Sequence, residues 1–293
     1  MFAIIGLVVV FGSVIGGFLL EKGNPLVLMQ PCELLIIFGS ALGTMLVANS
    51  PETILSIAKS LFGVTGGSPF TKGYYLESLN MLHDIFQQGR KIGMAKFEDD
   101  VDNPDRSAAF LKHPALLGDR HLLHFICDTL RMSASGVVAT YDLDDILERD
   151  IEVHHGQQMI PVRALQTVAD ALPGLGIVAA VLGVVMTMDA MGGPPSEIGR
   201  KVGAALVGTF LGILLSYGAV SPIAANIEKR VDAATQYHQV LRAGLLAFAK
   251  GMPTAIAVEC ARRTIPYGVR PTFEEMEAAR RRDAGGVAIA SAA

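Results

Sequence analysis

The sequence predicts an all-α integral membrane protein with four membrane-spanning helices and a helical cytoplasmic domain. Of its 293 residues, 51% are hydrophobic and only 18% are charged, and the mean hydropathy is +0.43. Four apolar runs account for this composition, and the alternation typical of strands is nowhere sustained. The net charge of −4 argues against nucleic acid as a partner, because nucleic-acid-binding proteins concentrate positive charge.

The four apolar runs define the predicted spans. A span needs about 20 mainly apolar residues, and we place the spans at residues 1–21, 33–50, 170–189 and 201–227. The first run lacks the positively charged start and the cleavage site of a signal peptide, so we expect it to be retained. The second is expected to continue beyond the membrane as a helix to about residue 62.

The two polar segments, residues 60–168 and 228–293, carry most of the Lys and Arg. The short connections between spans are poor in both. Positive charge near span ends favours the cytoplasmic side of a membrane. We therefore expect a multi-pass protein whose termini and large polar domain are all cytoplasmic.

Both polar segments are predicted to be helical. Apolar residues recur at helical spacing in three stretches, residues 76–86, 122–130 and 143–151. The charged stretch Lys96–Arg106 is interpreted as a turn between helices. Thr272 and Glu275 have the spacing of a capping box, which predicts a short C-terminal helix followed by a disordered tail from Asp283.

Small residues four apart indicate close packing between spans. Glycine pairs of this kind occur in three of the four predicted spans, as Gly12 with Gly16, Gly39 with Gly43, and Gly208 with Gly212. Such pairs let membrane helices approach closely. We expect a tightly packed assembly.

The third and fourth runs contain no Asp, Glu, Lys, Arg or His between Asp170 and Asp189 or between Lys201 and Glu228. Ionisable groups inside spans usually mark ion paths, so an ion path here would borrow its titrating group from another chain. Thr209 is the most deeply placed polar residue of the fourth run. Ala180 is predicted at comparable depth in the third.

Two prolines are predicted at one depth, at the cytoplasmic mouth of the hairpin formed by these two runs. Pro173 is expected at the start of the third span, where its missing N–H removes no bond. Pro222 falls inside a helix predicted to continue to Lys250, where it would remove a hydrogen bond and cause a kink. The pair is a candidate hinge.

Catalytic and metal-binding patterns are weak. No phosphate-binding loop, nucleophile elbow or H-E-x-x-H motif occurs. His154 and His155 are adjacent and would point to different faces of a helix, and the pair His121 and His124 lacks a third ligand at typical spacing. The sequence therefore predicts neither an enzyme nor a metal or cofactor site.

Four stretches are specific enough to indicate a family. They are GRKIGMAKFEDDVDNP (Gly89–Pro104), LPGLGIVAAVLGVV (Leu172–Val185), VGTFLGILLSYGAVSPIA (Val207–Ala224) and RPTFEEME (Arg270–Glu277). Through them the chain resembles, over nearly its whole length, the MotA stator family of flagellar motors within the wider MotA/TolQ/ExbB proton channel group.

This resemblance implies an assembly. Five copies of such a subunit form a homopentamer in the lipid of the bacterial inner membrane, around the spans of a dimeric partner, MotB. The partner supplies the proton-binding aspartate and grips peptidoglycan, which fits the lack of ionisable residues in the third and fourth runs. Proton flow then produces torque on the rotor protein FliG and powers motility, with no cofactor other than the transported ion.

The resemblance also assigns roles to residues. The prolines that match Pro173 and Pro222 couple ion passage to movement, and the charges that match Arg90 and Glu98 face FliG. Asp150 stands where the best-known relatives have glutamate, so it keeps the charge with a shorter reach.

The same resemblance bears on the choice of ion. Sodium-driven relatives have threonine at the position of Ala180, whereas the threonine that matches Thr209 occurs in both kinds. Sodium needs several oxygen ligands, whereas a proton relay needs only a titrating carboxylate and water. Alanine at position 180 therefore favours protons.

Three alternatives remain open. A TolQ/ExbB-like energy-coupling subunit would drive outer-membrane processes instead of a rotor, although the large domain with Arg90 and Glu98 disfavours it. A self-contained transporter is disfavoured because such a protein normally supplies its own ion site. A membrane scaffold would conduct nothing even with its partner.

Overall fold

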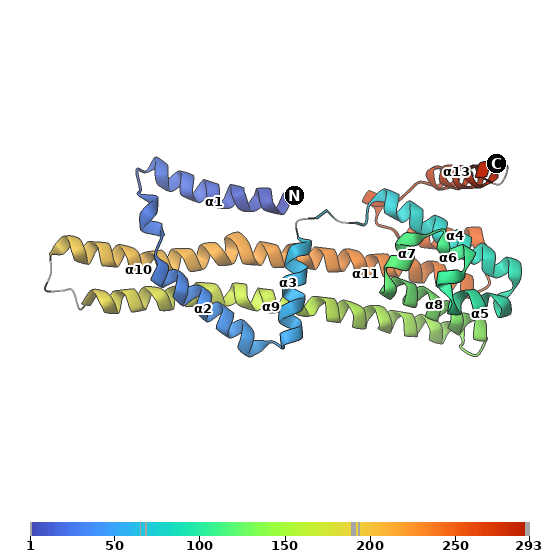
Figure 1. The fold of residues 1–293 in the computed structure, drawn as a ribbon, viewed down its shortest axis with the longest axis horizontal. Helices are drawn as coiled ribbons and strands as arrows, with labels where there is room; N and C mark the ends of the chain where they lie inside the picture. Colours follow the sequence, from blue (N-terminus) through green and yellow to red (C-terminus); the bar gives the residue numbers. More distant parts are fainter. Residues whose placement is uncertain (1, 65, 68, 189–191, 193, 291–293) are drawn as a thin grey trace. The chain divides into compact units, whose positions relative to one another are not determined.

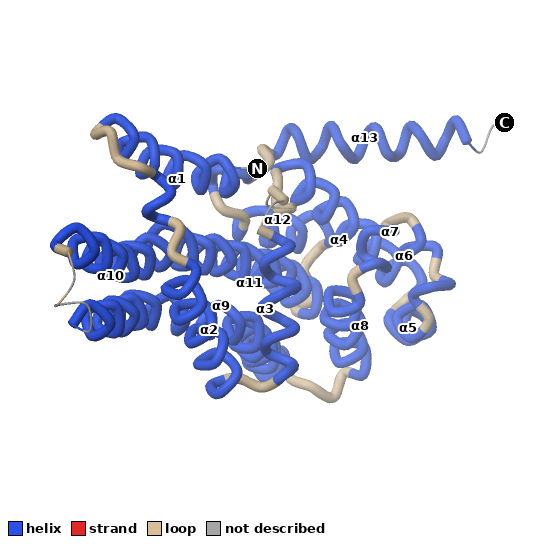
Figure 2. Tube along the Cα trace, turned by 60° about the vertical axis from the view of Figure 1, so that its left-hand side comes forward, coloured by secondary structure: helices blue, strands red, loops and turns tan. Residues whose placement is uncertain are grey.

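The computed structural model describes residues 2–64, 66–67, 69–188, 192 and 194–290. Over these residues the chain is helical and has no strands (Figures 1 and 2). It divides into two compact units. Unit 1 comprises Met1–Gly67 and Gly156–Val231, and unit 2 comprises Ser68–His155 and Asp232–Ala293.

Unit 1 holds the apolar helices. They are α1 (Phe2–Leu20), the short η1 (Pro25–Leu28), α2 (Pro31–Ala48), α3 (Pro51–Gly63), the C-terminal part of α9 (Thr140–Met188), α10 (Pro195–Leu215) and the start of α11 (Ser221–Ala249). Among the described residues, four helical segments are long and apolar enough to cross a membrane, by length and composition. They agree with the four apolar runs of the sequence.

The helix is interrupted between α2 and α3, which corrects the single helix predicted to reach residue 62. Pro51 has no N–H, and the residue before a proline is disfavoured in helical conformation. Ser50 is accordingly extended, with φ −69° and ψ 156°. Its Oγ accepts a hydrogen bond from Thr53 N at 3.3 Å, so Ser50 starts a new helix as its N-cap.

The long helix α9 corrects a second expectation. The sequence places Pro173 at the start of a span, but α9 is one helix from Thr140 to Met188 with both Pro161 and Pro173 in its interior. Apolar residues precede Pro173 as well as follow it, so packing favours continuity over the break that a proline alone would cause.

Among its described residues, unit 2 contains nine helical elements besides the N-terminal part of α9 and most of α11. They are α4 (Lys72–Ile92), α5 (Met94–Asp102), η2 (Pro104–Arg106), α6 (Ala108–Leu111), α7 (Pro114–Gly118), α8 (Arg120–Ser135), α12 (Thr254–Thr264), η4 (Tyr267–Val269) and α13 (Phe273–Ala290). Its core confirms the three helical stretches expected from apolar spacing, because each contributes fully buried residues such as Leu82, Ile126 and Leu143. The rings of Phe86 and Phe248 stack within this core with centroids 4.4 Å apart.

The charged stretch Lys96–Arg106 is mostly helix rather than the predicted turn, because α5 runs to Asp102. Phe97 and Val101, four residues apart within it, are 0% and 2% exposed and join the core. Gly93, at φ +83°, makes the bend before α5, a conformation that other residues rarely adopt. Two apolar residues at helical spacing outweigh the charges around them.

The C-terminal capping box is confirmed. Thr272 N donates to Glu275 Oε2 at 2.7 Å, and Glu275 N donates to Thr272 Oγ1 at 3.2 Å. The helix that follows, α13, runs from Phe273 to Ala290. The disordered tail expected from Asp283 stays a prediction. The tail residues 291–293 lie outside the described residues.

Candidate functional site

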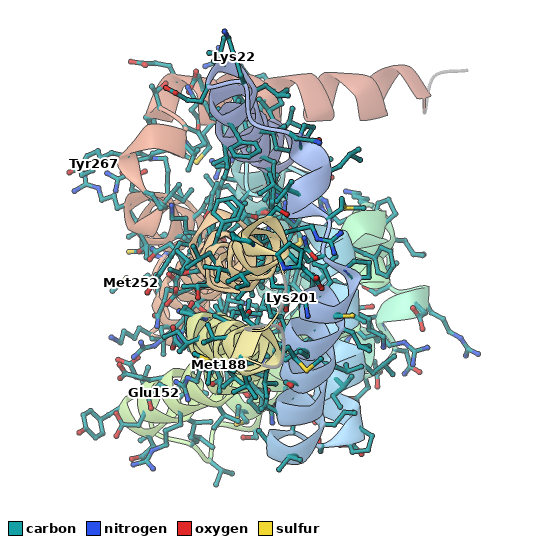
Figure 3. The ribbon with its side chains drawn as sticks, turned by 90° about the vertical axis from the view of Figure 1, so that its left-hand side faces the viewer. Lys22, Glu152, Met188, Lys201, Met252 and Tyr267 are labelled. Atoms are coloured by element: carbon teal, nitrogen blue, oxygen red, sulfur yellow. The ribbon has the colours of Figure 1, made fainter. Side chains whose placement is uncertain are left out.

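The site is the hairpin of α9 and α10 in unit 1, where two helices pack backbone against backbone. These segments lie side by side in Figures 1 and 2, and Figure 3 views the hairpin end on, with Met188 of α9 and Lys201 of α10 labelled. A Cβ added to Gly176 would lie only 2.8 Å from Gly208 O, and one added to Gly212 only 2.9 Å from Gly176 Cα. The predicted close packing at Gly208 and Gly212 is therefore confirmed.

Ala180 and Thr209 lie at this contact. A Cβ on Gly208 would be 3.3 Å from Ala180 N, and a Cβ on Gly176 would be 3.3 Å from Thr209 Cα. The two residues thus occupy the same level of the hairpin, as the sequence predicts. Ala180 brings no polar side-chain atom there, so Thr209 supplies the hydroxyl at this level.

Pro173 and Pro222 do not share one depth, which corrects the sequence-based expectation. A Cβ on Gly212 would lie 2.6 Å from Leu172 O, so Pro173 is level with Gly212. Ten residues, about 15 Å of helix, separate Gly212 from Pro222. The expectation assumed that the third span starts at Pro173, whereas α9 passes through it.

Pro222 follows a π-helical segment, η3 (Ser216–Val220), that separates α10 from α11. Ser221 N donates to Ser216 O, five residues back instead of four. In a regular α-helix Pro222 would clash with the carbonyl of Gly218 and could not donate to it. The wider turn before the proline relieves this conflict, and π-turns are frequent at functional sites.

Glu33 is a site residue that the sequence reasoning missed. It lies in the first turn of α2 and is only 7% exposed. A Cβ on Gly183 of α9 would be 3.5 Å from Glu33 Oε1. The signal was present in the sequence, as a lone acidic residue at the edge of an apolar run, but its burial depends on contact with a distant helix.

The three charged residues expected at the rotor all lie in unit 2 and are exposed. Arg90, in the last turn of α4, also donates to the carbonyl of Met252, which is labelled in Figure 3, and lies 5.7 Å from the ring centroid of Phe248. Glu98 projects from α5 and Asp150 from α9. Arg90 therefore has a local structural contact besides any role at a surface.

The other two glycine pairs have no partner helix in unit 1. A Cβ added to Gly12, Gly16, Gly39 or Gly43 would meet no other atom within 4 Å among the described residues. On α1 no residue is buried. These faces of α1 and α2 are open in the single chain.

The fold and the hairpin define a helical membrane protein of the multi-span class. The Motility protein A N-terminal model matches residues 4–93, and the MotA/TolQ/ExbB proton channel family model matches residues 120–239. The chain is 37% identical to Motility protein A of Escherichia coli strain K12 over 277 residues, which is 94% of each chain. The chain therefore belongs to the motility protein A family, within the MotA/TolQ/ExbB proton channel family.

Solved structures share the fold. The structure of C. jejuni MotAB matches 90% of this chain and 95% of that chain, with a TM-score of 0.73 and 17% identity. The flagellar MotAB stator complex from Bacillus subtilis matches 92% of this chain and 97% of that chain, with a TM-score of 0.73 and 20% identity.

Proposed function

We propose that the chain is a stator subunit of the bacterial flagellar motor, which conducts protons together with a MotB-type partner and converts their flow into torque. Membership of the motility protein A family supports this function. The observation that carries the mechanism is the α9–α10 hairpin. It is packed tightly at its glycines, has Pro173 inside α9, continues toward Pro222 in α11, and has no Asp, Glu, Lys, Arg or His between Asp170 and Asp189 or between Lys201 and Glu228.

The partner supplies the missing carboxylate in this proposal. Protons enter beside α9 and α10, protonate an aspartate on the partner's span, and leave toward the cytoplasm past Pro173. The hairpin presents a largely apolar outer surface for this contact, including Val181 and Val185 of α9 and Leu206 of α10, which are 55%, 57% and 65% exposed in the single chain.

Assembly follows from the faces left open. Gly12 and Gly16 on α1 and Gly39 and Gly43 on α2 permit close approach of a neighbouring subunit. We propose a homopentamer around a partner dimer, in the inner membrane, with both termini and unit 2 in the cytoplasm. Arg90, Glu98 and Asp150 then form the surface that acts on the rotor protein FliG.

The energetics are sufficient for a conformational step. A unit charge that crosses 100 mV releases about 2.3 kcal/mol. This can bias two states of a helix pair that differ by a few kcal/mol. The π-turn before Pro222 is the element whose hydrogen-bond register can change.

The test is cytoplasmic acidification in cells that express the chain with a partner whose plug is deleted. We expect acidification with and without sodium, and its loss when the partner's membrane aspartate becomes asparagine. Absence of ion flux from a well-assembled complex would favour the scaffold alternative, and flux that requires sodium would refute proton use.

Topology has a separate test, because Cys32 is exposed at the start of α2. A membrane-impermeant maleimide added to intact cells should label Cys32. In a Cys32→Ser background, Arg106→Cys should be labelled only after permeabilisation, since Arg106 is an exposed residue of unit 2. Labelling of both positions from outside would refute the proposed orientation.

A further inference from the structure

Three histidines from three helices meet in unit 2. His121 of α8, His154 of α9 and His238 of α11 each offer one ring nitrogen, and these atoms all lie within 4.8 Å of one another. The rings of His121 and His154 stack with centroids 3.7 Å apart, and the centroids of His154 and His238 are 5.1 Å apart.

The hydrogen bonding of His238 leaves one nitrogen available. Its Nδ1 lies 2.9 Å from the carbonyl oxygen of Ala234, which can only accept, so Nδ1 carries the proton. The side chain is 7% exposed, and its Nε2 has no hydrogen-bond partner among the described residues. A buried lone pair of His238 is therefore left without a donor, on a ring that lies beside the other two.

We propose that His121, His154 and His238 bind a first-row divalent cation, with Zn²⁺ as the best fit. Three imidazoles and a water are a recurring ligand set for zinc, with Zn–N distances of about 2.0–2.1 Å. Such tetrahedral ligands stand about 3.3 Å apart, so nitrogens now as far apart as 4.8 Å must approach by about 1.5 Å. His121 is exposed and stacks on His154, so its ring is the one that must reorient for all three nitrogens to converge.

Burial disfavours positive charge at these rings, and it lowers the pKa of His154 to about 4 and also lowers the pKa of His238. Nearby carboxylates act in the opposite direction. Asp119 lies close enough to act on both rings electrostatically, and Asp150 acts on His238. The bond from His238 Nδ1 to a backbone carbonyl is the outer contact typical of metal-bound histidine.

The sequence analysis predicts no metal site, because it looks for histidines at the local spacings typical of metal ligands. The histidines near His154 and His121 in sequence do not join the cluster. His155 Nδ1 lies 2.9 Å from Thr235 Oγ1, and His124 is exposed on α8 outside the cluster. The ligands that do meet lie far apart in the sequence. The proposal rests on the meeting of these three rings and does not depend on the proposed motor function.

The experiment measures zinc binding by the full-length chain, co-purified with its partner in detergent through a tag that contains no histidine. After chelation, the complex is equilibrated with Zn²⁺ and its metal content is measured. Titration with Co²⁺ adds a spectroscopic test, because tetrahedral cobalt absorbs strongly in the visible. We compare the natural chain with His121→Ala, and with His124→Ala as a matched control on the same helix.

We expect one zinc per chain, with binding weakened at least tenfold in His121→Ala and unchanged in His124→Ala. His121 is exposed, so its replacement should leave the fold intact, and equal secondary structure by circular dichroism checks this. Zinc should raise the unfolding temperature of the natural chain and of His124→Ala but not of His121→Ala. Binding below one zinc per chain, or equal binding by the two variants, would overturn the proposal.

Discussion

Gly212→Ala is the sharpest test of the hairpin. The new Cβ would lie 2.6 Å from Leu172 O, 2.9 Å from Gly176 Cα and 3.2 Å from Gly176 N. All three atoms are backbone of α9, so no flexible side chain can move aside. Because nonbonded carbon atoms prefer about 3.5–4.0 Å, the two helices must separate by roughly 0.5–1 Å, at the level of Pro173.

The magnitude follows from two opposing effects. Overpacking of this kind costs about 1–3 kcal/mol, whereas alanine stabilises a helix by about 1 kcal/mol relative to glycine. Gly203→Ala on the same helix is a matched control, because a Cβ there would meet nothing within 4 Å. The gain in helix propensity is then common to both variants. The difference between their free energies of unfolding therefore measures the clash, which we expect to cost about 1–3 kcal/mol.

The assay is thermal unfolding of the purified complex, together with swimming speed. About 1 kcal/mol shifts the melting temperature by about 2–4 °C in a chain of roughly this size, so Gly212→Ala should unfold about 2–12 °C below Gly203→Ala. Cells that carry Gly212→Ala should also swim more slowly, since the proposed ion path borders the displaced contact. If Gly212→Ala matched or exceeded the control in both readouts, the backbone contact between α9 and α10 would be refuted.

Three further predictions follow from the same residues. Pro222→Ala should remove the reason for the π-turn and reduce swimming speed several-fold at equal membrane abundance. Pro195→Ala, at the first residue of α10, should leave the π-turn and the swimming speed unchanged. Normal motility in Pro222→Ala would contradict the hinge. Glu98→Lys, on an exposed side chain, should change stability by less than about 0.5 kcal/mol while greatly reducing swimming, and unaffected swimming would remove Glu98 from the rotor surface. The hydrogen bond from Arg262 lowers the pKa of Glu259 to about 2, below its value of about 4.3 in the unfolded chain. The contribution of ionised Glu259 to stability is therefore present above about pH 4 and is lost as the pH falls toward 2. Glu259→Gln should be less stable than the natural chain at pH 7 and approach its stability in acid, as urea unfolding at several pH values would measure. Parallel curves of stability against pH would contradict this account.

Features carried by local pattern were predictable from the sequence. The apolar runs became helices, and Thr272 and Glu275 formed their reciprocal bonds, because each depends on residues within a few positions of one another. Gly208 and Gly212 also lie at a close contact between helices, as their four-residue spacing indicates.

Features that depend on distant contacts were not predictable. The charged stretch around Phe97 is helical because the Phe97 side chain is buried in a core formed with other helices. Pro173 lies inside α9 because packing on both sides outweighs one missing hydrogen bond. Glu33 is buried because α2 packs beside a distant part of the chain, where a Cβ on Gly183 of α9 would lie 3.5 Å from its Oε1.

The uneven packing of the hairpin bears on where it can move. Separating α9 from α10 at Gly176 and Gly212 would sacrifice backbone contacts along the whole glycine seam. A change of hydrogen-bond register within Ser216–Val220 is local by comparison, and its cost is the clash of Pro222 with the Gly218 carbonyl in α register. One proton that crosses 100 mV supplies only about 2.3 kcal/mol, which is too little to disrupt the seam and also rearrange the subunit. We infer that the step driven by a proton keeps α9 and α10 together as one body, and that the change occurs between Ser216 and Pro222, where α10 continues into α11.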